Sequence, residues 1–134
     1  MGTFSTEIAI GGLDRERWAT VDALVDTGAS IVSAPASLLR GLGVEPAWKQ
    51  GFEFADGETR EMDVGHAWVR VGGREITTQV LFNEEGSAAL LGALALEGAF
   101  LGVNPVRKRL MPVGGWLARV LKEQERGTLT ARRR

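Results

Sequence analysis

The segment LVDTGASIVSA, residues 24–34, is an apolar run interrupted by one acidic residue, Asp26. The residues before it alternate between polar and apolar from Trp18 to Val25, which predicts a strand with Asp26 at its C-terminal end. Asp and Gly are common in turns, so a turn-forming role is one explanation for this residue. A carboxylate buried without a partner is very costly, however, and the apolar setting indicates that another group shares the charge of Asp26.

The composition is that of an ordinary folded domain. Of the 134 residues, 44% are hydrophobic and 25% are charged, and the 18 glycines favour short strands joined by tight turns. We therefore expect a mainly β fold. The sequence has no cysteine, which excludes thiolate metal sites and cysteine nucleophiles. Its one histidine, His66, is interpreted as a surface or structural residue, and we expect no metal site and no cofactor.

Charge and hydropathy set the expected location and partners. No stretch approaches 18 apolar residues, and the N-terminus lacks the features of a signal peptide, so we expect a cytoplasmic protein with no membrane partner. Residues 1–103 carry 7 Lys+Arg and 15 Asp+Glu, whereas residues 104–134 carry 9 and 2. The basic end has no interleaved aromatic residues, and we expect no nucleic-acid partner. Binding of this end to nucleic acid or to an acidic partner is a weaker alternative.

Alternation and turn residues predict a series of short elements in the first two thirds of the chain. Strands are expected in STEIAIGG, residues 5–12, and in IVSA, residues 31–34. Pro35 opens a segment of one or two helical turns, in which it takes the first helical position. Two hairpins are expected over residues 49–82, the first with a type I′ turn at Asp56-Gly57 and the second with a turn at Gly72-Gly73.

The last third predicts further short elements. Residues 88–100, AALLGALALEGAF, predict a buried strand that ends at Leu90-Leu91-Gly92, followed by a short helix that Gly98 stops. Residues 101–113 predict two strands joined by an Asn-Pro turn. WLARVLKEQER, residues 116–126, carries apolar residues at helical spacing and predicts an amphipathic helix that docks on the body or on a partner.

The Asp-Thr-Gly-Ala after a strand, the hairpin with a glycine at its tip and the late Leu-Leu-Gly before a helix together resemble the retropepsin-type aspartic proteases. The resemblance is in particular to the small, retroviral-like single-domain members found in bacteria. The resemblance covers residues 5–112 and implies a retropepsin-like closed β-barrel or β-sandwich with a flap hairpin and one short helix after Leu90-Leu91-Gly92. It thus implies a retropepsin-like protease domain over residues 1–114, followed by the additional amphipathic helix and basic tail over residues 115–134.

The resemblance also implies an activity. Aspartic endopeptidases use two Asp carboxylates that share a proton, one acting as base on a water and the other as acid on the scissile carbonyl. This chain has a single Asp-Thr-Gly, so a second copy of the chain must supply the other carboxylate. We expect a C2 homodimer with two Asp26 residues on its axis, acting on a peptide or protein substrate. The alternative is a dimeric protein-binding module with the same fold and little or no catalysis.

Site residues follow from the same resemblance. Asp26 is the expected catalytic residue, and Thr27, Gly28 and Ala29 support the active-site turn, with Thr27 bracing the two turns of the dimer. Viral members commonly have an Arg after the late glycine that pairs with an acid near the Asp-Thr-Gly, and here these positions are Ala93 and Ser30. The flap is expected over residues 52–62. The candidate substrate-binding residues are Leu24, Ser30, Ile31, Val32 and Leu90 along the cleft, with Ala55, Asp56 and Gly57 at the flap tip, and the apolar cleft residues are equally compatible with the core.

Overall fold

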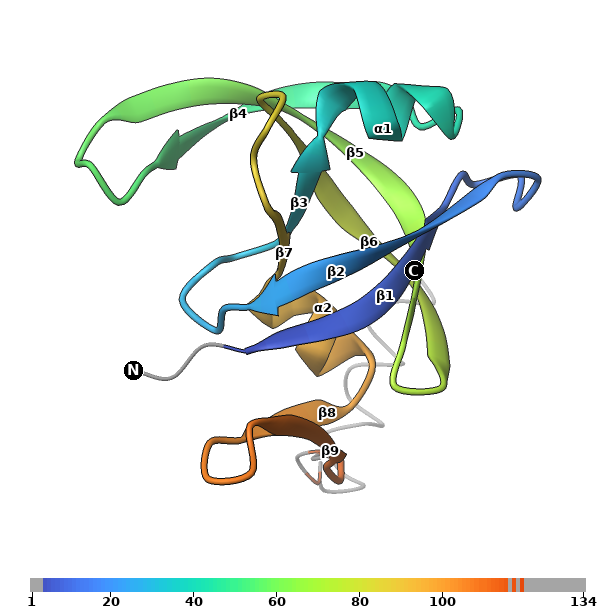
Figure 1. The fold of residues 1–134 in the computed structure, drawn as a ribbon, viewed down its shortest axis with the longest axis vertical. Helices are drawn as coiled ribbons and strands as arrows, with labels where there is room; N and C mark the ends of the chain where they lie inside the picture. The colour runs from blue at the N-terminus through green and yellow to red at the C-terminus, as the bar shows by residue number, and fades with distance from the viewer. Residues whose placement is uncertain (1–3, 116, 118, 120–134) are drawn as a thin grey trace, which may run out of the picture.

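The computed structural model describes residues 4–115, 117 and 119 (Figure 1). They form a mainly β fold, as expected, with two six-residue helices. No helix among these residues is long and apolar enough to cross a membrane. In chain order the elements are β1 (Ser5–Gly11), β2 (Trp18–Val25), β3 (Val32–Pro35), α1 (Ala36–Gly41), β4 (Pro46–Glu53), β5 (Thr59–Val71), β6 (Arg74–Asn83), β7 (Ala89–Leu91), α2 (Ala93–Gly98), β8 (Leu101–Asn104) and β9 (Arg109–Pro112).

Six of the strands close into a barrel in the order β1-β2-β7-β3-β6-β5, because β1 pairs with both β2 and β5. β4 lies outside this ring and pairs with the N-terminal part of β5. In Figure 1 the β4–β5 hairpin extends from the barrel at the top left of the view, whereas the separate β8–β9 sheet lies at the opposite end. Because the ring is closed, its six strands have no free edge. The β4–β5 hairpin projects from this ring.

The pairing of β7 decides where the Asp-Thr-Gly turn lies. β7 runs parallel to β2 and antiparallel to β3, so that Leu90 is opposite Leu24 on one side and Ser33 on the other. The chain leaves β2, forms the turn and enters β3, and it must therefore pass over the C-terminal end of β7 to do so. The turn and the end of β7 are thus held together by strand pairing on both sides.

Alternation along the strands builds the core. In β1, Ile8 and Ile10 are fully buried, whereas Ala9 between them is half-buried and Glu7 before them is exposed, as the period of two requires. Burying a side chain of this size contributes about 1.5–3 kcal/mol relative to leaving it in water. The largest fully buried side chains of the barrel and α1 are Ile8, Ile10, Val32, Leu39, Val64, Val69, Val71, Val80 and Leu91.

The first hairpin does not have the predicted turn. A type I′ turn needs a positive φ at both central residues, and only Gly57 has one, at 87°. The Gly57 N–H donates to the Phe54 carbonyl at 2.9 Å and the Phe54 N–H donates to the Glu58 carbonyl at 2.8 Å, so the loop has three residues, 55–57. The prediction of a type I′ turn is therefore wrong. Asp56 favours the longer loop because its carboxylate accepts the Glu58 N–H at 2.9 Å.

The second hairpin turns where the sequence predicts. Gly72 and Gly73 have φ values of 56° and 78°, and the strand pair Val71–Arg74 closes directly around them. This is the two-residue loop with positive φ at both positions that glycine permits.

The amphipathic helix predicted over residues 116–126 lies almost wholly outside the described residues, as does the tail.

The N-terminus of α1 is capped by a distant loop. Pro35 was expected at the first helical position, but it is the N-cap residue and the helix begins at Ala36. Pro35 makes no side-chain capping hydrogen bond. Instead the Glu85 carboxylate accepts hydrogen bonds from the Ser37 hydroxyl at 2.6 Å and from the Ser37 N–H at 2.9 Å. The Ser37 hydroxyl first, and its N–H second, hold the pKa of Glu85 below its ordinary value.

Glu85→Gln is expected to lower the thermal midpoint at neutral pH, because the neutral amide binds the Ser37 donors more weakly than the carboxylate does. A folded-state pKa below the unfolded one means that Glu85 stabilises the protein above its unfolded pKa, and that this contribution is lost as the pH falls through the folded pKa. The difference between variant and wild type should therefore shrink below about pH 4. Calorimetry between neutral and acid pH measures it, with the exposed Glu61→Gln as control. A difference that is constant across this range contradicts the assignment.

Candidate active site

Asp26 lies half-buried at the end of β2, in the first position of a hydrogen-bonded turn. Its Oδ1 atom accepts the Gly28 N–H at 2.9 Å, and its carbonyl accepts the Ala29 N–H at 3.1 Å. Its own N–H donates to the Leu91 carbonyl of β7 at 3.0 Å. The backbone of Asp26 is thus held at both its N–H and its carbonyl, and within the described residues the Gly28 N–H is the one donor that its carboxylate binds.

The same turn is fastened to the start of α2. The Ala93 N–H donates to the Ala29 carbonyl at 2.8 Å, and the Leu94 N–H donates to the Ser30 carbonyl at 3.0 Å. These are amide groups of the first helical turn, which have no partner inside a helix. The segments that lack the side-chain brace of viral members, at Ser30 and Ala93, are therefore joined by two backbone hydrogen bonds between neighbouring residues.

Gly92 makes this attachment possible. A Cβ atom at this position would lie 2.6 Å from the Ile31 carbonyl oxygen and 2.8 Å from the Ala29 carbonyl oxygen, closer than a real Cβ approaches. The φ of Gly92 is −98°, which any residue adopts, so the need for glycine comes from the contact and not from the backbone conformation. The glycine of the Leu-Leu-Gly segment is therefore required because the backbone that follows Asp-Thr-Gly packs closely against it.

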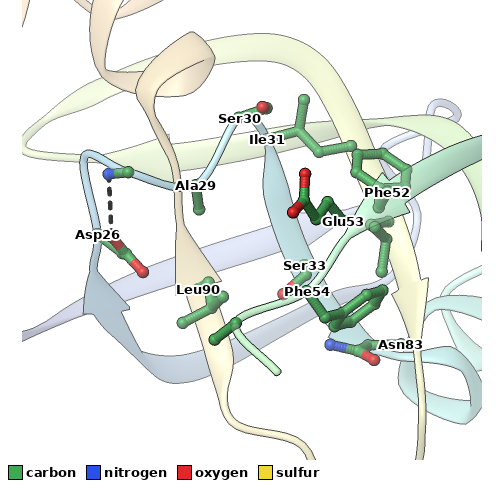
Figure 2. Close-up of a pocket in the computed structure, with 13 residues that line it drawn as sticks. Asp26, Ala29, Ser30, Ile31, Ser33, Phe52, Glu53, Phe54, Asn83 and Leu90 are labelled. Atoms are coloured by element: carbon green, nitrogen blue, oxygen red, sulfur yellow. Dashed lines mark hydrogen bonds between the residues drawn. The ribbon is translucent and has the colours of Figure 1, made fainter. Parts of the chain in front are cut away.

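A cavity of about 580 Å³ opens beside Asp26 (Figure 2). Three parts of the chain line it. The Asp-Thr-Gly turn and β3 form one wall, the β4–β5 hairpin forms a second through residues 52–55, and Leu81, Asn83 and Leu90 of β6 and β7 complete it. The hairpin that was predicted as a flap therefore faces the turn that was predicted to be catalytic.

The structure brings most of the predicted site residues to this cavity. Its lining includes Asp26, Gly28, Ala29, Ser30, Ile31, Ala55 and Leu90.

The other predicted residues do not line it. Val32 is fully buried in the main core, because neighbouring residues of a strand point to opposite faces and Ser33 points to the cavity. Val32 is therefore a core residue. This is one of the two roles that the sequence left open for it, the other being a wall of the substrate cleft. The remaining predicted positions that lie outside the lining of this chain are Leu24, Thr27, Asp56 and Gly57.

Sequence reasoning did not find Ser33, Leu81 and Asn83. The alternation of Ile31 and Ser33 with Val32 and Ala34 was a usable signal for Ser33. Leu81 and Asn83 reach the cavity because β6 pairs in parallel with β3, a contact between segments that are far apart in the sequence. Phe52, Glu53 and Phe54 fall within the predicted flap but were not singled out.

His66 is exposed on β5 and does not line the cavity. Its ring centroid lies 5.6 Å from that of Trp48, in a tilted arrangement. This is the surface position that the sequence predicted for the single histidine.

Comparisons with known proteins agree with this arrangement. The family model described as gag-polyprotein putative aspartyl protease matches residues 17–98. No curated protein sequence matches the chain. The solution structure of the simian foamy virus (mac) protease has a TM-score of 0.51 at 21% identity, over 70% of this chain and 92% of that chain.

Two further solved structures are similar. The EIAV protease, solved in complex with the inhibitor HBY-793, has a TM-score of 0.54 at 20% identity, over 72% of this chain and 86% of that chain. A retropepsin-like aspartic protease from Rickettsia conorii has a TM-score of 0.49 at 19% identity, over 77% and 88% of the two chains. The predicted retropepsin-like fold is confirmed. Because the family match spans more than half of the sequence and includes both the Asp-Thr-Gly turn and Gly92, the chain belongs to the gag-polyprotein putative aspartyl protease family of retropepsin-like proteases.

Proposed function

We propose that the protein is an aspartic endopeptidase that works as a homodimer, with one Asp26 carboxylate from each chain. The observation that carries the proposal is the placement of Asp26, which a backbone N–H fixes at the edge of a cavity large enough for part of a peptide. The other carboxylate that lines this cavity belongs to Glu53 on the hairpin, and Figure 2 shows Leu90 between it and Asp26. Because the described residues place no second carboxylate beside Asp26 in this cavity, the paired carboxylate in this proposal comes from a second chain.

The chemistry follows from two like charges placed close together. They cannot both ionise easily, so the pair holds one proton between them. The ionised carboxylate takes a proton from a bound water, which attacks the scissile carbonyl, while the protonated one donates to the carbonyl oxygen. In this proposal Thr27 braces the two turns across the dimer axis, and the Gly28 carbonyl accepts a hydrogen bond from the substrate backbone.

The β4–β5 hairpin serves as the flap. Residues 52–55 line the cavity opposite the catalytic turn, and among the described strands the hairpin pairs with the rest of the fold only through β5. A hairpin attached along one strand is free to bend at its tip, which allows it to open for a peptide and then exclude water. Asp56 and Gly57, exposed at the tip, would contact the substrate or the partner flap in the closed state.

The expected setting of this enzyme is cytoplasmic, with a peptide or protein substrate and with no membrane or nucleic-acid partner. These expectations rest on the sequence. The division into a protease domain over residues 1–114 and a C-terminal helix and tail over residues 115–134 is likewise a prediction.

A mixing experiment tests the shared site. Wild-type and Asp26→Asn chains are refolded together in equal amounts, so that random pairing leaves about one quarter of the dimers with two Asp26 residues. We expect the hydrolysis of an unfolded protein, per total chain, to fall to that fraction. Mixing with Glu16→Gln chains, which carry an equivalent charge change at an exposed position of the β1–β2 loop, away from the cavity and the flap, should cause no loss. Activity that falls only to one half, as simple dilution gives, contradicts a site built from two chains.

A further inference from the structure

The part of the cavity away from Asp26 carries a carboxylate and a buried hydroxyl but no cationic side chain. Glu53 contributes a carboxylate and Ser33 a hydroxyl, and the residues that line the cavity include no Lys, Arg or His. The amide oxygen of Asn83, which also lines the cavity, already accepts the Glu84 N–H at 2.8 Å. Figure 2 shows the Glu53 carboxylate and the Ser33 hydroxyl in the space between Leu90 and the rings of Phe52 and Phe54. An uncompensated negative charge therefore faces a pocket with aromatic walls.

Ser33 provides an independent sign that something binds there. The residue is only 4% exposed, and its hydroxyl has no hydrogen-bond partner among the described residues. Buried hydroxyl groups nearly always have a partner, because leaving one unpaired costs the free energy of its lost hydration. A ligand group that enters the pocket would supply that partner.

Glu53 has no cation to balance it. Within the described residues its carboxylate forms no ion pair and accepts no hydrogen bond. The guanidinium of Arg60 lies on the same hairpin, 4.1 Å from the Phe54 ring centroid, but it is shared among Asp56 at 3.4 Å and Glu58 and Glu84 at 3.5 Å. Arg60 is therefore committed to other carboxylates, and the charge of Glu53 remains available to a ligand.

We propose that this part of the cavity receives a lysine or arginine side chain of the peptide substrate, with Glu53 as the specificity-determining residue. The proposal rests on the proposed function for the identity of the ligand as a peptide. The cationic group donates to Glu53 and Ser33, and the rings of Phe52 and Phe54 favour a cation near their faces. The aliphatic stem of a long basic side chain packs on Leu81, which leaves its charged end at the carboxylate.

Binding of matched peptides tests the inference without requiring turnover. The probes are fluorescein-labelled octapeptides of alanine and leucine that carry Arg, Lys, norleucine or Glu at each position next to the central bond, and the protein is the full-length Asp26→Asn variant. Fluorescence anisotropy should give dissociation constants about tenfold lower for the best Arg or Lys peptide than for its norleucine counterpart, the effect of one partly exposed charge pair. In the Asp26→Asn background, Glu53→Gln should remove most of this ratio and Ser33→Ala should reduce it, whereas Glu16→Gln, at an exposed position outside the flap, should preserve it.

The outcomes separate the inference from the proposed function. Equal affinity for the Arg, Lys and norleucine peptides, or a preference that survives Glu53→Gln, overturns the role of Glu53. If the wild type then still hydrolyses an unfolded protein through Asp26, the protease proposal stands alone. If the wild type hydrolyses nothing but the cation preference depends on Glu53, the pocket is specific for basic side chains and the endopeptidase proposal fails. Tighter binding of the Glu peptides also overturns the inference, because the charge of the pocket then has the opposite effect.

Discussion

Replacing Asp26 with asparagine is expected to lower the hydrolysis of an unfolded protein substrate by roughly 10³-fold or more, because the dimer loses both groups that exchange protons during the reaction. Asparagine keeps an oxygen that accepts the Gly28 N–H, which Asp26 binds at 2.9 Å, so the turn keeps its shape. It cannot take a proton from water. Release of fluorescent peptides from labelled, unfolded protein at mildly acid to neutral pH measures the loss.

Two measurements show whether that loss is chemical. Sedimentation should give the same dimer fraction for Asp26→Asn as for wild type, and the thermal midpoint should not fall, since two neutral amides avoid the cost of holding an ionised carboxylate next to a second acid. If the variant hydrolyses the substrate as fast as wild type, Asp26 is not the catalytic residue. If the wild type hydrolyses nothing yet binds peptides, the alternative of a dimeric binding module is supported instead.

Local patterns in the sequence predicted most of the barrel, because each strand buries one face. Ile8 and Ile10 follow the period of two in β1, and the glycine pair at 72–73 marks a hairpin, because a two-residue loop requires positive φ at both positions. The position of Asp26 was predictable for a similar reason. A charge at the end of an apolar strand is costly unless a special environment receives it, so it is visible in a single sequence.

Contacts between distant segments were not predictable from these patterns. Glu85 caps Ser37 across 48 residues, and nothing in the local sequence of either indicates the pair. Ser33 faces the cavity because β3 lies between β7 and β6, an order set by the closure of the whole barrel. At the first hairpin, Asp56-Gly57 suited two turn types, and the hydrogen bond from the Glu58 N–H to Asp56 favours the longer loop.

Gly92→Ala is expected to destabilise the protein by about 3 kcal/mol or more, at the upper end of the cost of overpacking. The new methyl would lie within 2.8 Å of two backbone carbonyl oxygens, those of Ala29 and Ile31, and backbone moves less readily than a side chain. The Ala29 carbonyl also accepts the Ala93 N–H at 2.8 Å, so relieving the contact breaks the attachment of the turn to α2. We expect the thermal midpoint to fall by roughly 10 °C and hydrolysis to fall at temperatures where the variant is still folded.

Gly98→Ala is the matched control for this prediction, since it makes the same substitution at the other end of α2. A Cβ at Gly98 would meet only the Ile76 Cδ1 atom, at 3.6 Å, which is ordinary contact. Alanine is the better helix former, so this variant should be neutral or more stable by about 0.5–1 kcal/mol, with activity unchanged. Equal midpoints for the two variants would mean that the junction of β7 and α2 yields easily. In that case close packing at Gly92 would not be what holds Asp26 in place, and the strand pairing of β7 with β2 and β3 would have to carry that role by itself.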